Sequence, residues 1–371
     1  QRERLASFLK ADRLRGFELD SAPMLRLTLF QWREASFTFV WTFHHALLDG
    51  RCYPMLLREV FEAYAELAQG EVAAREAPPS YRQYIDWLQQ HSPAEARSYW
   101  KELLTGFFAP TPLVIERTVP AEEPLYQQGE AWEILDSALT ARLRALAKEY
   151  ELTLNALVMG AWAILLHRYS GEQDIVFGAT RACRKSTVAG AEDMIGLFIN
   201  TLPVRLKLSS EDAALSVFKA ARQQWMDMRP YEHTPLVQVK GVSQVPPTQP
   251  LFETLLVFEK YRLDTAMRSL GGAWTKRRVE LHRLTDFPIR LLAYDGQELS
   301  FKIEFDRRRL DEAAITRLLG HLRRLLEGIV TNPMESVGGL PMLTEAERKE
   351  LTIDWNTTSA DVPNRRTVHG W

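Results

Sequence analysis

The sequence lacks the features that mark secreted, membrane-spanning and metal-binding proteins. Only two of its 371 residues are cysteine, Cys52 and Cys183, so neither a disulfide framework nor a cysteine metal site is expected. No apolar run is long enough to span a bilayer, and the charged first residues lack the apolar centre of a signal peptide. We therefore expect a cytoplasmic protein that has no membrane partner.

The chain also lacks a net charge that would attract a polyanion. Its 46 basic and 48 acidic residues leave a formal charge of only -2. Binding to nucleic acid or to an anionic lipid surface then has no electrostatic drive, and we expect no nucleic-acid partner. No phosphate-binding loop, dinucleotide fingerprint, low-complexity tract or internal repeat is present either, which disfavours the folds built on those signals.

What the sequence does have is the composition of a globular protein, with 46% hydrophobic and 25% charged residues. A chain of 371 residues is long for one hydrophobic core, so we expect two lobes packed together. The first residue is Gln1 and not Met, which leads us to expect a piece of something larger.

The order of the predicted elements indicates the α+β class. Apolar periodicity predicts helices at 3–15, 51–69, 80–90, 93–104, 137–150, 153–169, 211–228 and 311–329, and strands at 25–30, 36–43, 132–135, 174–179, 201–208, 252–258, 279–283, 289–294 and 299–305. Strands and helices mix without strict alternation, which argues against a doubly wound fold. Prolines interrupt residues 110–130, so we place the crossover there, between an N-terminal lobe at 1–109 and a C-terminal lobe at 131–342.

Two adjacent histidines stand where the second predicted strand ends. Residues 44–50 read HHALLDG, just before the helix expected at 51–69. Neighbouring side chains of a strand point to opposite faces, so His44 and His45 cannot both enter one site if the strand continues through them. One imidazole could enter a cleft, with Asp49 bracing the loop and Gly50 permitting close backbone approach. A lone histidine at a strand edge is usually a satisfied polar residue, but the pair followed by Asp-Gly favours a functional role.

The HHALLDG segment resembles the HHxxxDG signature of the condensation domains of nonribosomal peptide synthetases, within the chloramphenicol-acetyltransferase-like superfamily. Later segments are similar to further motifs of that family in the same order: YRQYIDW at 81–87, IGLFINTLPVR at 195–205, EHTPL at 232–236 and PLFET at 250–254. The family normally carries more chain before the histidine pair, so the resemblance implies an incomplete first lobe. Residues 343–371 resemble the linker into an adenylation domain.

The resemblance implies two acetyltransferase-like lobes in a V around a central tunnel, and an acyltransferase that forms amide bonds. A donor acyl or peptidyl thioester and an acceptor aminoacyl thioester would enter on the phosphopantetheine arms of upstream and downstream peptidyl carrier proteins. The domain itself would bind no cofactor and no metal, and an adenylation domain would follow in the same chain. The segments at 236–239 and 252–258 look more like members that accept an L-configured donor.

The same resemblance implies roles for single residues. His45 would be the catalytic residue, acting as a base, as an amine-positioning acceptor or as an oxyanion partner, while His44 would be structural. Asp49 would be architectural, because a carboxylate with a reference pKa near 4 is a poor acceptor for a proton from an ammonium group. Its expected partner in an ion pair is Arg184, with Arg181 as the alternative.

Two polar residues and two rival functions stay open at this point. Asn200 and Thr201 could line the tunnel or could simply be satisfied within the fold. An epimerisation domain shares the histidine pair but moves only an α-proton, and the NTLPVR segment at 200–205 together with the adenylation-type linker favours condensation. A catalytically silent domain that recruits carrier or tailoring proteins is the nonenzymatic alternative, against which intact His45 and Asp49 count.

Overall fold

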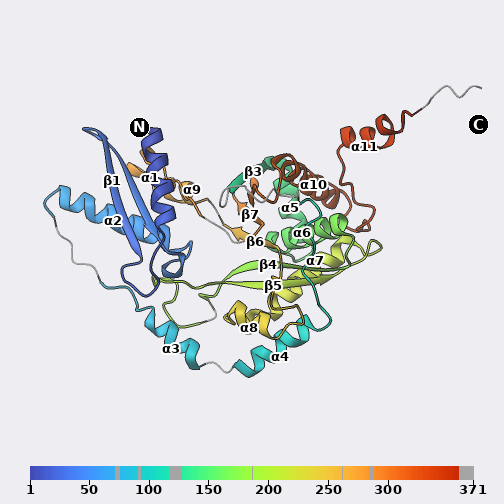
Figure 1. Ribbon diagram of the computed structural model, residues 1–371, viewed down its shortest axis with the longest axis horizontal. Coiled ribbons are helices and arrows are strands. Elements are labelled where there is room, and N and C mark those ends of the chain that lie inside the picture. The colour runs from blue at the N-terminus through green and yellow to red at the C-terminus, as the bar shows by residue number, and fades with distance from the viewer. Residues whose placement is uncertain are drawn as a thin grey trace, which may run out of the picture.

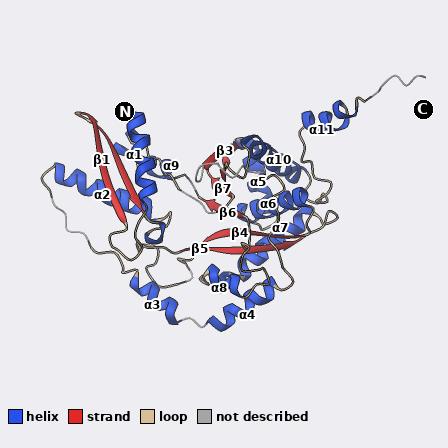
Figure 2. Cartoon of the chain, in the orientation of Figure 1, coloured by secondary structure: helices blue, strands red, loops and turns tan. Residues whose placement is uncertain are grey.

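The computed structural model describes residues 1–71, 76–90, 93–116, 128–185, 187–260, 262–283 and 287–358. A small N-terminal part carries a two-stranded sheet, and a larger part is built on a six-stranded sheet (Figure 1). Helices and strands are mixed in both parts, as the colouring of Figure 2 makes plain. The α+β class expected from the sequence is confirmed.

The N-terminal part is a hairpin flanked by helices. It contains α1 (Arg2–Arg15), β1 (Leu25–Arg33), β2 (Ser36–Phe43) and α2 (Cys52–Ala68). The two strands pair antiparallel, and an ion pair of 2.7 Å between Arg26 and Asp12 ties β1 to α1. Below the hairpin a small core of Leu48, Cys52 and Tyr53 forms, with aromatic residues of β2 packed against it. The end of β2 and the start of α2 are fixed there, and the histidine pair lies between them.

The connecting helices pass from one part to the other. They are α3 (Arg82–Gln90) and α4 (Pro93–Leu104). Trp100 and Leu104 are fully buried in the core of the larger part, so α4 packs with that part although we expected it in the first lobe. The chain therefore joins the larger core before the expected crossover at 110–130, of which residues 117–127 lie outside the described residues.

The larger part is built around its sheet, whose strand order is β3-β8-β7-β6-β4-β5. The strands are β3 (Gln128–Ile134), β4 (Asp174–Ala182), β5 (Ile199–Lys207), β6 (Thr254–Glu259), β7 (Ile289–Asp295) and β8 (Leu299–Asp306). The helices are α5 (Ser137–Glu149), α6 (Leu154–Ser170), α7 (Ala214–Asp227), α8 (Leu236–Gly241), α9 (Leu263–Arg268), α10 (Glu312–Thr331) and α11 (Glu345–Thr352). β6 runs parallel to β4 and β7, whereas the other pairs are antiparallel.

Helix α6 anchors the core of this part because it is apolar on every face. It begins at Thr153, whose hydroxyl accepts a hydrogen bond from the N–H of Ala156 at 3.1 Å, and it ends at Gly171 in the left-handed region. Its side chains are buried almost throughout, as expected for a helix covered on all sides by other elements. None of the described helices is long and apolar enough to cross a bilayer.

One predicted strand is wrong. Residues 279–283 alternate apolar and polar side chains, but they form no strand. Both edges of β7 are already paired, with β6 and β8, so this segment has no strand edge to join there. It is held instead through the N–H of Val279, which donates to Asp264, and through an ion pair of 3.2 Å between Arg283 and Glu259.

Candidate active site

The two histidines differ in exposure because β2 ends at Phe43 and the chain turns into a short 3₁₀ helix at His45–Leu47. His44 is half-buried, its N–H donates to the carbonyl of Met24 at 3.0 Å, and its Nδ1 accepts from the N–H of Ala46 at 3.2 Å. An accepting Nδ1 carries no proton, so the proton of neutral His44 is on Nε2. His45 is exposed, and its imidazole makes no hydrogen bond within the described part of the chain.

Asp49 is buried beneath this loop, with its side chain 1% exposed. Oδ1 accepts hydrogen bonds from the N–H groups of Arg51 and Cys52, at 3.1 and 3.3 Å, next to the start of α2. These bonds satisfy N–H groups that a helix start leaves without intrahelical partners. Oδ2 accepts from the N–H of Phe198 at 3.0 Å, which joins the motif to the larger part of the molecule.

Arg184 brings the countercharge from the larger part. Its side chain is 2% exposed, and NH2 donates to both oxygens of Asp49 at 2.9 and 3.0 Å. NH1 donates to two backbone carbonyls of the loop before β5, at 2.6 and 2.8 Å, and the guanidinium lies 4.2 Å from the centroid of the Phe198 ring. The expected ion pair is present. Together with the backbone N–H donors, it fills the roughly four hydrogen-bond acceptor sites that the Asp49 carboxylate offers. Arg181, the alternative partner, is engaged elsewhere.

A cysteine and a glycine close the contact between the two parts. The thiol of Cys52 donates to the carbonyl of Gly196 at 3.2 Å, and the N–H of Gly196 points back to the sulfur at 3.4 Å. Burial raises the pKa of the Cys52 thiol, which keeps it protonated as a donor. The hydroxyl of Tyr81 donates to the carbonyl of Leu197 at 2.6 Å. A Cβ on Gly196 would lie 2.1 Å from the Tyr81 ring, so only glycine fits there.

Gly50 stands in open space, and its expected role in the site stays a prediction. A Cβ built on Gly50 meets no described atom within 4 Å, and its backbone lies outside the left-handed region. The residue is exposed at the start of α2, so no neighbouring backbone demands a glycine there. Among the protein's own contacts, a tight approach occurs at Gly196.

Asn200 lies in β5 and is fully used by the fold. Its Nδ2 donates to the carbonyls of Glu232 and Thr234, at 2.9 and 2.6 Å, and its Oδ1 accepts from the N–H of Thr201 at 2.9 Å. These bonds hold the EHTPL segment against β5. Of the two interpretations left open for Asn200, structural satisfaction is the one these contacts favour. Thr201 itself is half-buried and pairs with Thr180 across the strands.

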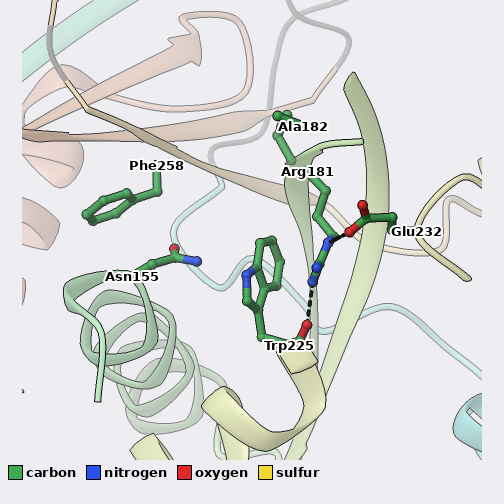
Figure 3. Close-up of a pocket in the computed structure, with 7 residues that line it drawn as sticks. Asn155, Arg181, Ala182, Trp225, Glu232 and Phe258 are labelled. Atoms are coloured by element: carbon green, nitrogen blue, oxygen red, sulfur yellow. Dashed lines mark hydrogen bonds and ion pairs between the residues drawn. The ribbon is translucent and has the colours of Figure 1, made fainter. Parts of the chain in front are cut away.

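A polar pocket of about 230 Å³ opens beside this network (Figure 3). Arg181 lies on one wall, where Nε donates to Glu232 at 2.5 Å, NH1 donates to the carbonyl of Trp225, and the guanidinium lies 4.2 Å from the Trp225 ring. Both charged side chains are buried, at 9% and 4% exposure. The thiol of Cys183 donates to the carbonyl of Glu232 at 3.3 Å, and burial raises the pKa of Cys183 to about 12.

Sequence reasoning missed this pocket. Arg181 was considered only as a partner for Asp49, and Glu232 only as part of a motif. Trp225 and Asn155 also line the pocket. They stand in α7 and α6, and nothing in the residue pattern of either helix marks them as different from ordinary helical residues. The EHTPL segment was the one available signal. Within the described residues, no group of His, Cys, Asp and Glu side chains is arranged to hold a metal ion.

Comparison with known families and sequences gives consistent matches along the chain. The family model described as "Condensation domain" matches residues 1–352. The chain is 36% identical over 370 residues to one of the linear gramicidin synthase proteins of Brevibacillus parabrevis, covering 100% of this chain and 5% of that protein. It is 32% identical over 370 residues to bacitracin synthase 3 of Bacillus licheniformis, covering 98% of this chain and 6% of that protein. The chain thus spans only about a twentieth of the length of these relatives.

Solved structures with the same fold include one nonribosomal peptide synthetase and one domain from teicoplanin biosynthesis. A four-domain nonribosomal peptide synthetase bound to AMP and glycine matches with a TM-score of 0.75 and 19% identity, over 94% of this chain and 28% of that one. The X-domain from teicoplanin biosynthesis matches with a TM-score of 0.75 and 22% identity, over 89% of this chain and 78% of that one. At these identities the likeness concerns the fold.

Proposed function

Because this chain belongs to the condensation-domain family of nonribosomal peptide synthetases, we propose that it forms an amide bond between two carrier-bound substrates. The donor is an acyl or peptidyl thioester and the acceptor is an aminoacyl thioester. Each arrives on the phosphopantetheine arm of a peptidyl carrier protein, upstream for the donor and downstream for the acceptor. The two arms meet in a tunnel between V-arranged lobes, and the residues from 343 onward lead towards an adenylation domain. Relatives named for gramicidin and bacitracin support a product of the antibiotic peptide class.

The observation that carries this proposal is the contrast between His45 and Asp49. The Asp49 carboxylate is buried and occupied by donors, so it has no free acceptor position to take a proton from a substrate. His45 is exposed, and its ring has no hydrogen-bond partner among the described residues. An imidazole that faces solvent at the end of a braced loop is suited to meet an incoming amine. His45 is therefore the catalytic residue of the proposal, with His44, Asp49 and Arg184 in supporting roles.

The step itself is an aminolysis. The acceptor amine attacks the donor carbonyl carbon, a C–N bond forms, the C–S bond breaks with its electron pair on sulfur, and one amine proton ends on the departing thiol. An α-amine has a reference pKa near 8, so a useful fraction is neutral at pH 7 without prior deprotonation. Holding both arms in one tunnel lowers the barrier by up to about 7–11 kcal/mol, and proton transfer through His45 by about 3–5 kcal/mol.

Carrier proteins loaded with defined substrates test the proposal. A donor carrier with an N-acyl aminoacyl thioester and an acceptor carrier with a free aminoacyl thioester are mixed with the chain, and intact-protein mass spectrometry follows the acceptor arm. A mass gain equal to the acyl aminoacyl unit supports condensation. With the assay run in D2O and both carrier arms followed, exchange of an α-hydrogen for solvent deuterium without that gain would instead identify an epimerisation domain. Neither change, with both carriers intact, would refute both enzymatic functions.

The donor configuration is tested in the same assay. We propose an L-configured donor, supported by the segments at 236–239 and 252–258, which look more like members of that type. Donor carriers that end in the D or the L form of one amino acid are compared at equal loading. Faster transfer of the D form would contradict this part of the proposal and leave condensation itself intact.

A catalytically silent recruiting domain is the second candidate. The observation in its favour is the fold shared with the teicoplanin X-domain, which was also solved as a complex with OxyB. In such a domain His45→Ala would leave the function unchanged, and binding of a tailoring protein, measured by calorimetry, would replace peptide formation as the readout. Condensation predicts the opposite, because the substitution removes the group at the reacting amine.

A further inference from the structure

The polar pocket beside the motif lies where an open sheet commonly binds ligands. Arg181 and Ala182 contribute to it from the carboxyl end of β4, Phe258 from the carboxyl end of β6, and Asn155 from the first turn of α6 (Figure 3). β4 and β6 are parallel neighbours, so their carboxyl ends open to the same side. The crevice outside such strand ends is the usual ligand site of sheets with parallel strands.

The wall of the pocket has no net charge. Arg181 and Glu232 are both buried, and the bond of 2.5 Å between them neutralises each by the other. A carboxylate entering here would be repelled by the carboxylate of Glu232, and an ammonium group would be repelled by the guanidinium of Arg181. A charged occupant would therefore lose its hydration without gaining an unpaired countercharge. This arrangement selects a neutral occupant.

One buried acceptor in the wall is unused. Oδ1 of Asn155 is shielded from solvent and has no hydrogen-bond partner within the described part of the chain. Buried polar atoms are nearly always paired, and each exception calls for an explanation. In Figure 3 the Asn155 side chain lies across the pocket from Arg181 and near Phe258. Because the atom is shielded, a turn of the Asn155 side chain is needed to present it to the pocket, where a ligand group that donates a hydrogen bond would satisfy it.

The pocket is fixed rigidly to the motif. Asn200 holds the backbone of Glu232, and Arg184 follows Arg181 by three residues in the same stretch of chain. Three residues span at most about 11 Å, so the pocket wall lies within that reach of the arginine that binds Asp49. The pocket is thus joined to the histidine loop through Arg184 and Asp49, and a substrate that spans this path with its reacting end near His45 places another of its groups in the pocket.

We propose that the pocket receives the side chain of one substrate, and that it selects a neutral side chain that donates a hydrogen bond, such as a carboxamide or a hydroxyl. The inference rests on the proposed function in that the occupant belongs to a substrate of the transfer. A cavity of about 230 Å³ is smaller than the 300–1,000 Å³ of sites that enclose whole drug-sized ligands, which suits a single side chain. Asn155 is the specificity-determining residue, since it offers the unpaired acceptor.

Binding of stable substrate mimics tests the proposal without requiring turnover. The probes are amides of glutamine, methionine and lysine with N-acetylethylenediamine, the nitrogen analogue of N-acetylcysteamine, in which an amide replaces the thioester and prevents transfer. Probes with a free α-amine represent the acceptor, and the same probes with an N-acetylated amine represent the donor. Calorimetry on the full chain gives a dissociation constant for each probe, and within each arm we compare the constants of the glutamine, methionine and lysine probes as ratios. We expect the glutamine probe to bind at least about tenfold tighter than the methionine probe in one of the two arms.

Substitutions of Asn155 assign the preference to this residue. Asn155→Leu removes the acceptor at similar size and should bring the glutamine-to-methionine ratio close to one. Asn155→Asp adds an unpaired carboxylate and should turn the preference towards the lysine probe, a reversal that simple loss of structure cannot imitate. Asn332→Leu makes the same chemical change at an exposed position beyond α10 and should leave the ratio unchanged.

The outcomes separate the pocket from the reaction. A ratio near one in both arms, or an equal ratio in the wild type and in Asn155→Leu, overturns the pocket proposal even if the carriers yield peptide. If Asn155→Leu does not fold, Asn155→Asp decides, and an unchanged preference for glutamine over lysine overturns it. A clear ratio that Asn155 controls, found in a chain that makes no peptide, upholds the pocket and refutes the proposed function alone.

Discussion

The ion pair between Asp49 and Arg184 gives the sharpest stability prediction. Both side chains are almost completely buried, at 1% and 2% exposure. Asp49→Asn keeps the shape of the side chain but strands the guanidinium, and Arg184→Met keeps much of the length but strands the carboxylate. Each single substitution should lower the free energy of unfolding by about 3–5 kcal/mol, because one uncompensated charge stays buried. At about 1.4 kcal/mol per factor of ten, this is a change of two to nearly four orders of magnitude in the unfolding equilibrium.

The double variant should cost clearly less than the sum of the single ones. Neither charge remains to be stranded, so we expect a coupling energy of about 2–3 kcal/mol, at the upper end for residues in direct contact. Equilibrium unfolding in urea measures all four corners of the cycle. Hydrogen exchange of the Phe198 amide adds a local measure, because this N–H donates to Asp49 at 3.0 Å.

A second cycle serves as the control. Arg58 and Glu62 form an exposed pair on α2, 3.9 Å apart, with 55% and 56% of their side chains exposed. Their coupling should stay below about 0.5 kcal/mol, as is usual for surface pairs on a helix. If the costs at Asp49 and Arg184 were additive, so that their coupling energy equalled that of the control pair within error, the structural role of the pair would be refuted. A fully stable but inactive Asp49→Asn would point to a direct chemical role for the carboxylate.

Three further predictions follow from the site. His45→Ala should lower peptide formation by on the order of 100-fold or more without changing the melting temperature, since the side chain is exposed; near-normal turnover would contradict its role. Gly196→Ala should destabilise the chain by about 1–3 kcal/mol in urea, because its Cβ would press on the Tyr81 ring, whereas Gly50→Ala should stay within about 0.5 kcal/mol; equal costs would be inconsistent with the packing. Cys183, fully buried and with its pKa raised to about 12, should react with an aromatic disulfide reagent only as fast as the chain unfolds, and rapid labelling below the urea transition would contradict this.

Much of the fold could be predicted from the sequence because its signals are local. The apolar run of α6 and the alternation along β2 each follow from the residues inside the element, and both match the structure closely. The segment at 279–283 has the same alternation, yet a strand also needs an unpaired neighbour, which no local pattern reveals. The placement of α4 with the second core likewise depends on Trp100 finding a partner surface far along the chain.

The site could be predicted only where a motif carries it. The brace between Asp49 and Arg184 follows from a family resemblance and not from spacing, since 135 residues separate the two. A glycine in a motif suggests tight backbone contact, whereas the protein atoms around Gly50 leave open space, so packing within the chain does not explain this glycine. The pocket around Asn155 could not have been predicted, because its wall is assembled from separate elements and its distinguishing feature is an unpaired atom.

The long separation of Asp49 and Arg184 has a consequence for biosynthesis. During translation the aspartate emerges first, and 135 residues must be added before its arginine is made. At about 5–20 residues per second this takes about 7–27 seconds, during which the carboxylate has no countercharge and stays hydrated. The segment around the histidine pair therefore cannot reach its final packing on the ribosome before Arg184 has been added. The loop that carries the histidine pair is completed only after Arg184 and the backbone N–H of Phe198 have been made.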